Sequence, residues 1–553
     1  MQGTARPLMA IQWLVAGLIL VLIQWGDAGR LAPTPVVAHA DLSPLFAEAR
    51  QTQGAARLAP EEADLVALYA PAPGTPLWMD ASGARTARAR AGLGLIEQAG
   101  SEGLDPADYG APELAALAAR LEESPSDRAM LAARFDVLLS LGVLRYFRHV
   151  HLGRVDPQTL GLQIPAATDA HDFAALLRSA IGQDRLAAAA ADLAPPLAQY
   201  QWLRTALARY RSMAAAPAAP DFDGTVHPGD VFAGLPALRR LLVTLGDLPA
   251  DTPLLSSHVY DTTISAGVAR FQRRHGLAAD GVIGLATAKA LQVSLSWRVR
   301  QIELALERLR WLPDLSRERL IAVNIPMFHL WAWDRVPSAD PPALAMSVIV
   351  GRALDSRTPV FAERMQYLVF QPYWNVPLSI LRSEILPEIR RDPEYLAREH
   401  MEIVDGASDR APVLSGTPDD IARLGTGSVR LRQRPGPENA LGLVKFMFPN
   451  RNDVYMHDTP ARALFDRARR DFSHGCIRVQ DPVALAEWVL APDRAWTRDR
   501  IVAAMNGAPN TRVDLAQPVQ VVIFYTTAAA LPDGTVQFAD DVYGQDGALD
   551  RAL

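Results

Sequence analysis

The run Ser473-His474-Gly475-Cys476-Ile477-Arg478 contains the one cysteine in a chain of 553 residues. A single cysteine excludes an intrachain disulfide, so Cys476 either packs in a core or carries chemistry. Structural cysteines are normally surrounded by apolar side chains. This one stands among His, Gly, Ser and Arg, which favour a reactive thiolate. The run therefore predicts a nucleophilic site at Cys476.

A second motif, Val454-Tyr455-Met456-His457-Asp458, lies upstream of the cysteine. A free thiol has a pKa of about 8.5, so few thiolates exist at neutral pH without help. A neighbouring imidazole can take the thiol proton and later return a proton to a leaving amine. The pair His457 and Cys476 thus predicts acyl transfer through a thioester.

Together the two motifs resemble the L,D-transpeptidases of the bacterial cell wall, whose YkuD-type catalytic domain carries a His followed by Ser/Thr-His-Gly-Cys. Two further stretches resemble the large YcbB-like branch of that family. They are Gln371-Pro372-Tyr373-Trp374-Asn375-Val376-Pro377 and, after it, Leu431-Arg432-Gln433-Arg434-Pro435-Gly436-Pro437-Glu438-Asn439 with Leu441-Gly442 and Lys445-Phe446. Four motifs in the same order make the resemblance specific.

The resemblance implies a reaction on peptidoglycan. Cys476 would attack the carbonyl of the diamino acid in a tetrapeptide stem and release the terminal D-Ala. A diamino acid amine of another stem would then accept the acyl group, which gives a 3-3 cross-link. No cofactor is implied, and carbapenems are expected to acylate the thiolate. Alternative acceptors are water (L,D-carboxypeptidase), a free D-amino acid (exchange) or a protein lysine (anchoring); a catalytically silent wall-binding scaffold is a further alternative.

The resemblance also assigns roles around the nucleophile. The main-chain carbonyl of Asp458 is expected to orient His457, with the Asp458 carboxylate as an alternative. The backbone N–H groups of Gly475 and Cys476 are expected to stabilise the oxyanion, since such a site needs preset donors, and Tyr455 would add a donor. Ser473 and His474 are expected to shape the loop and form hydrogen bonds near the thiol.

Three more residues are candidates for substrate binding. Arg478 suits a stem carboxylate because guanidinium matches carboxylate geometry; an ion pair with Asp471 or Asp481 is the alternative. Trp374 and Asn375 are candidates to line the groove, although aromatic residues in an extended segment also serve as core.

Composition and the absence of certain motifs argue against several other classes of function. The net charge is −6 and no long basic block is present, so nucleic acid is not an expected partner. No His-Glu-x-x-His and no Cys-His cluster occurs, which argues against a zinc peptidase. No Ser-x-x-Lys with its companion motifs is evident in the catalytic region, which disfavours a serine penicillin-binding enzyme.

The N-terminus predicts export. A largely apolar stretch, residues 8–25, has about the shortest length that spans a membrane. Ala38-His39-Ala40 offers a small-x-small cleavage site. Residues 1–40 are thus either a cleaved signal peptide or an inner-membrane anchor, and both place the rest in the periplasm or cell envelope. Cell-wall synthases are possible partners there.

The chain is long enough for several domains, and we expect an α+β multidomain fold. Periodicity predicts helices near 113–121 and 129–147, and β-branched runs predict strands near 320–325, 344–350, 366–371 and 519–525. The expected units are a mostly helical scaffold (41–235), a three-helix peptidoglycan-binding-like module (236–293), a connecting helix (294–314), a β-rich catalytic domain (315–526) with a helical capping insertion (about 378–440), and a loosely held C-terminal tail (527–553).

Overall fold

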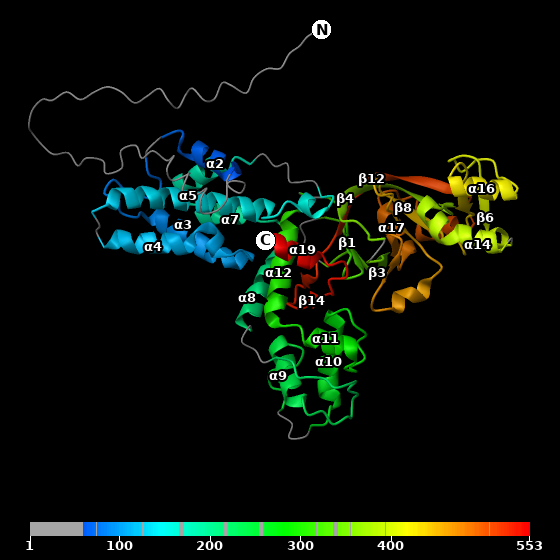
Figure 1. The fold of residues 1–553 in the computed structure, drawn as a ribbon, viewed down its shortest axis with the longest axis horizontal. Coiled ribbons are helices and arrows are strands. Elements are labelled where there is room, and N and C mark those ends of the chain that lie inside the picture. The colour runs from blue at the N-terminus through cyan, green and yellow to red at the C-terminus, as the bar shows by residue number, and fades with distance from the viewer. Residues whose placement is uncertain are drawn as a thin grey trace, which may run out of the picture.

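The fold is seen in a computed structural model, which describes residues 59–553 except for gaps at 73–74, 124–125, 165–170, 214–217, 254–257, 314, 316–317, 336–340, 354–355, 393 and 508. The expected signal or anchor in residues 1–40 lies outside the described residues. Three lobes meet around one central helix, α12 (Leu295–Arg310). The β-rich lobe carries an insertion, which forms the end of this lobe that lies farthest from α12 (Figure 1). Within the described part of the chain, no helix is both long and apolar enough to cross a membrane.

The N-terminal lobe is helical, as predicted. Its longest helix, α5, is buried along most of its length. The buried carboxylate of Asp136 on this helix accepts hydrogen bonds from the Tyr69 hydroxyl at 2.6 Å and from the Trp78 N–H at 2.7 Å. The helices of this lobe are α2 (Ala59–Tyr69), α3 (Ala87–Glu97), α4 (Ala111–Glu122), α5 (Arg128–Leu152), α6 (Phe173–Gly182), α7 (Leu186–Leu193) and α8 (Ala198–Ser212).

The small lobe is the predicted three-helix module, with α9 (Leu235–Leu245), α10 (Thr262–Arg274) and α11 (Leu285–Leu291). Its apolar side chains form a core of their own. The Gln272 side chain accepts from the Gly281 N–H at 2.8 Å and so holds the turn between α10 and α11. Gly281 has a φ of +71°, a backbone conformation that glycine adopts without steric cost.

The β-rich lobe is built on one nine-stranded sheet, in the order β10-β3-β11-β9-β8-β4-β12-β1-β2. Because β2 also pairs with β3, the sheet closes on itself. The predicted strands are confirmed in β1, β3, β4 and β12, whereas the sequence patterns did not predict β2 or the short strands β8, β9, β10 and β11. The strands are β1 (Leu320–Asn324), β2 (His329–Trp333), β3 (Leu344–Gly351), β4 (Phe361–Phe370), β8 (Val444–Met447), β9 (Met456–His457), β10 (Asp471–Ser473), β11 (Ile477–Val479) and β12 (Thr511–Phe524). Helices α17 (Pro482–Leu490) and α18 (Arg498–Gly507) follow β11 in the chain.

The insertion between β4 and β8 is helical only in part. Besides its helices it contains a three-stranded sheet in the order β5-β7-β6. Its apolar side chains form a separate cluster, so the insertion is a small subdomain. Its elements are β5 (Trp374–Asn375), α13 (Leu378–Ile380), the π-helical turn η4 (Leu381–Ile385), α14 (Leu386–Arg391), α15 (Tyr395–Arg398), β6 (Met401–Val404), α16 (Pro418–Thr426) and β7 (Arg430–Gln433).

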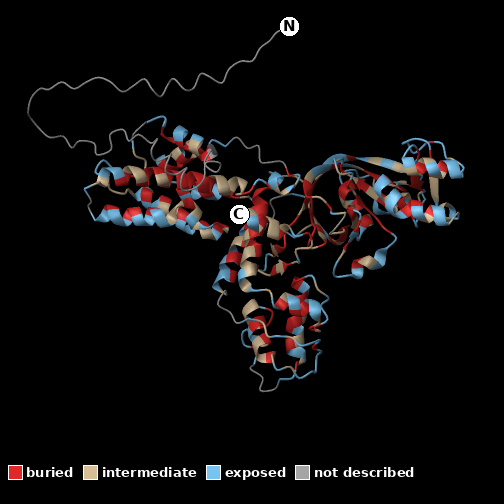
Figure 2. Cartoon of the chain, in the orientation of Figure 1, coloured by how far each residue is buried: buried red, intermediate tan, exposed pale blue. Residues whose placement is uncertain are grey.

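The C-terminal tail is not loosely held, contrary to expectation. It forms β13 (Ala528–Ala530), β14 (Val536–Phe538) and α19 (Gln545–Ala552), beside the central helix α12 (Leu295–Arg310). The ring of Phe538 stacks on His275 of the small lobe, with 5.7 Å between centroids. The small residues of the tail also allow close packing, since Ala528 is fully buried. Figure 2 shows buried positions on the facing sides of all three lobes.

We expect Asp546→Ala to destabilise the protein by about 3–5 kcal/mol, because breaking a buried pair leaves an uncompensated charge. Asp546 is fully buried and pairs with Arg308 of α12 at 2.5 Å. Chemical denaturation would measure the loss. Asp550→Ala is the matched control, since its pair with Arg300 is more exposed and should contribute less than about 1 kcal/mol. Equal effects of the two substitutions would contradict the expectation.

Candidate active site

The cysteine lies in a tight turn between β10 and β11. Gly475 has a φ of +114°, which only glycine adopts readily. The Ser473 hydroxyl donates to the Cys476 carbonyl at 2.5 Å and accepts from the Gly475 N–H at 3.1 Å. The buried Ser473 therefore closes the turn, as its predicted loop-shaping role requires.

This arrangement differs from the expected oxyanion site. The Gly475 N–H is engaged by Ser473, so it is not a free donor in this structure. The Cys476 N–H makes no hydrogen bond to any described residue. Of the two expected backbone donors, only that of Cys476 is thus available, and Gly475 serves the shape of the turn.

His457 lies on β9, buried beside β11. Its Nδ1 is 2.5 Å from the main-chain oxygen of Asp458. A carbonyl only accepts, so Nδ1 carries the proton and Nε2 is left unprotonated. Burial, with Arg478 adding, lowers the pKa of His457 to about 3. The imidazole is therefore neutral at physiological pH.

The Asp458 side chain does not contact His457 through a hydrogen bond. One carboxylate oxygen accepts from the Leu443 N–H at 2.9 Å, and the other pairs with Arg462 at 3.2 Å. Asp458 thus presents its carbonyl, not its carboxylate, to the ring. This geometry matches the expected orienting carbonyl and leaves the carboxylate alternative without support.

The thiol is partly exposed and protonated at rest. Burial raises the pKa of Cys476, while Tyr455 acts in the opposite direction. Its Sγ donates to the Asp453 carbonyl at 3.8 Å, and no hydrogen bond joins it to His457 in the described structure. Tyr455 lies two residues before His457 and packs edge-to-face on it, with 5.8 Å between centroids. A neutral thiol and a neutral imidazole therefore line the same cleft.

The turn is braced from a distant part of the chain. The Thr358 hydroxyl donates to the Gly475 carbonyl at 2.8 Å and accepts from the Gly351 N–H at 2.9 Å. Tyr543 of the C-terminal tail donates to the Gly351 carbonyl at 2.6 Å and accepts from the Thr358 N–H at 3.2 Å. The tail thus positions the cysteine turn, a contact that the sequence motifs did not indicate.

The insertion contacts the same turn from the other side. His474 Nε2 lies 2.7 Å from a carboxylate oxygen of Glu384 on η4, and both contact Arg352. His474 therefore faces the insertion, not the thiol. Trp374 and Asn375 come together with the site as well, because β5 lines the same cleft. Trp374 packs partly on the core of the insertion, whereas Asn375 is exposed.

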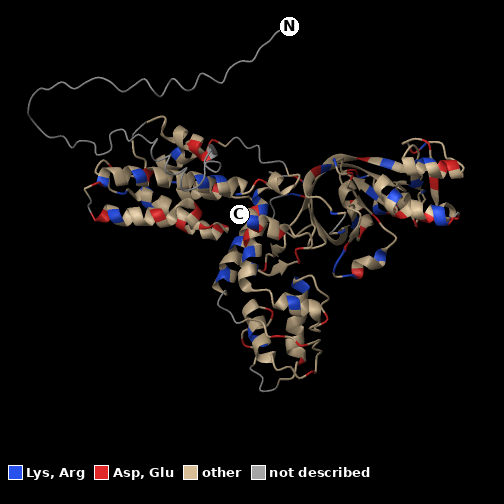
Figure 3. Cartoon of the chain, viewed as in Figure 1, with Lys and Arg blue, Asp and Glu red and all other residues tan. Residues whose placement is uncertain are grey.

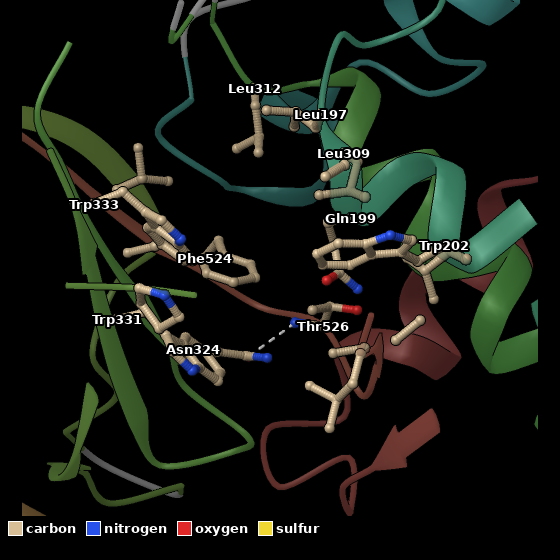
Figure 4. A pocket seen from close by; sticks show the side chains of 18 of the residues that line it. Leu197, Gln199, Trp202, Leu309, Leu312, Asn324, Trp331, Trp333, Phe524 and Thr526 are labelled. Carbon is tan, nitrogen blue, oxygen red and sulfur yellow. Dashed lines mark hydrogen bonds between the residues drawn. The ribbon is translucent and has the colours of Figure 1, made fainter. Parts of the chain in front are cut away.

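The cleft has a volume of about 1150 Å³, and its lining includes all of the predicted site residues except Asp458. Its lining is polar and apolar in similar measure. A second hollow, of about 200 Å³, lies between α8 and the β1–β2 edge and is almost wholly apolar. Figure 4 shows Trp202, Trp331 and Trp333 around it. Among the described residues, neither a cysteine nor a histidine lines that hollow, whereas Cys476, His457 and His474 all line the cleft.

Comparison with family models agrees with this organisation. Residues 63–207 match a scaffold domain, residues 234–291 match a "Putative peptidoglycan binding domain", and residues 318–521 match the L,D-transpeptidase catalytic domain of the YkuD family. The β-rich lobe is an L,D-transpeptidase catalytic domain. The family suggested by the motifs is thereby confirmed, whereas the YcbB-like branch stays a prediction.

One curated relative is the "Putative L,D-transpeptidase" of Haemophilus influenzae, 29% identical over 259 residues. The match covers 46% of this chain and 49% of the relative, so it spans about half of each. Solved structures similar to parts of this chain include L,D-transpeptidases from Xylanimonas cellulosilytica (15% identity, TM-score 0.17, 55% of this chain and 100% of that one) and Stackebrandtia nassauensis (13%, 0.21, 56% and 97%).

Several residues of the L,D-transpeptidase site escaped the motif analysis. Lys445 belongs to one of the motifs, but the motif alone did not indicate a role for it. The next residue, Phe446, lies in the core, and because neighbouring side chains of a strand point to opposite faces, Lys445 lies on the face that lines the cleft. Glu384, Thr358 and Tyr543 lie outside every motif. No single-sequence signal identifies these three, because sheet closure and the insertion bring them to the turn.

Proposed function

We propose that this protein is a cysteine-dependent L,D-transpeptidase that forms 3-3 cross-links in peptidoglycan. The observation that carries the proposal is the site around Cys476, where a lone thiol shares a polar cleft with an imidazole oriented by a backbone carbonyl. The L,D-transpeptidase and peptidoglycan-binding domain matches support peptidoglycan as the substrate. Action on this polymer places the enzyme in the cell envelope.

The reaction begins with rotation of the Cys476 side chain away from the Asp453 carbonyl. His457 Nε2 takes the thiol proton as sulfur bonds to the carbonyl carbon of the diamino acid in the tetrapeptide stem. The negative charge that develops on the carbonyl oxygen is stabilised by the Cys476 N–H and the Tyr455 hydroxyl. Collapse of this intermediate breaks the amide bond, and His457 returns the proton to the nitrogen of the departing D-Ala.

The thioester conserves the energy of the broken amide, so no nucleotide or other cofactor is required. An incoming diamino acid amine attacks the thioester, and His457 takes one of its protons. The new amide forms, and the thiolate leaves and recovers that proton. The insertion borders the cleft through Glu384 and β5, which supports its role as a cap over the cleft.

The test is incubation of the purified full chain with tetrapeptide-containing peptidoglycan, followed by mass analysis of released products. Free D-Ala together with 3-3 dimers is the expected result. D-Ala with tripeptides alone would instead indicate the carboxypeptidase activity, and exchanged or protein-linked stems would indicate the other acceptors. A folded protein that releases no D-Ala and gains no mass from a carbapenem would overturn the proposal and leave a wall-binding scaffold.

A further inference from the structure

Among the cationic side chains that line the catalytic cleft, Lys445 and Arg478 lie on the central sheet and have no anionic partner among the described residues. Neither side chain forms an ion pair or hydrogen bond with any described residue. The Nε of Arg478 is buried and has no acceptor. The two carboxylates nearest to Arg478 in sequence are engaged elsewhere, because Asp471 pairs with Arg469 and Asp481 caps α17.

Strand register places these two cations in one row with the catalytic imidazole. Lys445 on β8 lies opposite His457 on β9, and Arg478 on β11 lies opposite His457 on its other side. Residues directly opposite on paired strands project from the same face of a sheet. Cys476 stands two positions before Arg478, immediately ahead of β11. The thiol is therefore beside a row of cation, imidazole and cation.

Both cations are half-buried, and a cation that is partly desolvated without a partner is costly, so binding an anion there is favourable. Burial lowers the pKa of both Lys445 and Arg478. Among the described carboxylates near them, Asp409 acts on Lys445 without forming an ion pair, Asp453 lines the cleft without forming an ion pair with either cation, and Glu384 is held by His474 and Arg352. With His457 and Cys476 neutral, this part of the cleft carries an excess positive charge.

We propose that Lys445 and Arg478 together bind the terminal carboxylate of the residue that leaves, and that Lys445 thereby selects the length of the donor stem. This inference rests on the proposed function. When the scissile carbonyl lies at Cys476, the carboxylate of a one-residue leaving group is only two bonds beyond the departing nitrogen, within reach of cations beside the thiol. A longer stem moves its carboxylate one residue away, and an amidated stem has no charge to offer.

The first experiment tests anion binding by Lys445 and Arg478, the proposed anion site, without requiring the transfer reaction. The full chain is alkylated at its one cysteine by iodoacetate or by iodoacetamide, which form the same carbon–sulfur bond with loss of iodide but differ in charge. We expect the iodoacetate-to-iodoacetamide rate ratio of Lys445→Met to fall about tenfold below wild type, as expected for loss of one partly shielded ion pair. Intact mass against time gives both rates.

Two variants serve as controls. Lys445→Arg keeps the charge and should retain most of the ratio. Arg430→Met removes a cation from β7, on the exposed rim of the same cleft, and should leave the ratio unchanged. If Lys445→Met slows both reagents equally, or if Arg430→Met has the same effect, the carboxylate site is wrong. Should Lys445→Met fail to fold, protection of the wild-type thiol from iodoacetamide by D-alanine but not by D-alaninamide tests the same site.

The second experiment connects the site to specificity. Wild type should release D-alanine from a tetrapeptide at least about tenfold faster, in kcat/KM, than it releases D-alaninamide from the amidated peptide, and Lys445→Met should lose this preference. Equal rates for both peptides on wild type would overturn the inference while leaving the transpeptidase proposal intact. No release from either peptide, with the alkylation ratio still high, would overturn the proposed function but not the anion site.

Discussion

Replacement of Cys476 by Ala is expected to abolish acylation by both peptide stems and carbapenems, a fall of more than about 10³-fold. No other thiol exists in the chain to replace it. The Ser473 hydroxyl, in the same turn as Cys476, is committed to closing that turn through two hydrogen bonds. Intact-protein mass spectrometry after mixing with a carbapenem measures the effect, since ring opening adds the whole mass of the antibiotic.

Folding must be separated from chemistry in this comparison. Cys476→Ser retains the shape of the turn and should keep the wild-type melting temperature, yet an alcohol is a far weaker nucleophile than a thiolate at neutral pH. Ser428→Ala changes an exposed side chain of the insertion that does not itself line the cleft, although Gly427 and Val429 do, and should acylate as wild type does. A full carbapenem adduct on Cys476→Ala would show that the nucleophile lies elsewhere.

Local motifs predicted the reacting groups because their geometry is set within a few residues of backbone. Gly475 bends the turn, Ser473 closes it, and the carbonyl of Asp458 meets the ring of the residue beside it. The helical scaffold and three-helix module were predictable for a similar reason, since their periodicity is local. Whether the Gly475 N–H is free to stabilise an oxyanion depends on which neighbour accepts from it, and in this structure that neighbour is Ser473.

The residues that support the site are distant in sequence and are brought together by the pairing order of the strands. Thr358 contacts Gly475 across 117 sequence positions, and Tyr543 contacts Gly351 across 192. No short window of sequence encodes the order in which nine strands pair. Composition misled at the tail for a related reason: Ala, Gly and Asp suggest mobility, but small residues also permit close packing and Asp546 finds a buried partner in Arg308.

The charges around the cleft likewise depend on strand pairing and are not visible from composition. Both signs are spread over all lobes (Figure 3), which accords with the small net charge. The excess positive charge arises only where β8, β9 and β11 align Lys445 and Arg478 on one face. The same alignment contributes to the low pKa of His457, so substrate binding and base strength are coupled in this site.

His457→Ala is expected to slow acylation at neutral pH by about 10²–10⁴-fold, the usual contribution of a positioned general base. Burial and Arg478 lower the pKa of His457 to about 3, and burial raises the pKa of Cys476. At pH 7 the resting pair is therefore thiol and imidazole, not thiolate and imidazolium. His457 must take the proton during attack, so its loss leaves only the scarce thiolate formed by dissociation into water.

The pH dependence gives this prediction its sign. Below the thiol pKa, the thiolate fraction of the variant rises tenfold for each pH unit, so acylation of His457→Ala should approach the wild-type rate as pH increases. Carbapenem acylation followed by intact mass from pH 6 to 10 measures the convergence. His400→Ala is the matched control, because His400 is exposed and contacts Glu438 in the insertion. A constant ratio of wild type to variant across this range, with a wild-type rate already flat at pH 6, would mean a preformed thiolate–imidazolium pair and contradict the neutral one.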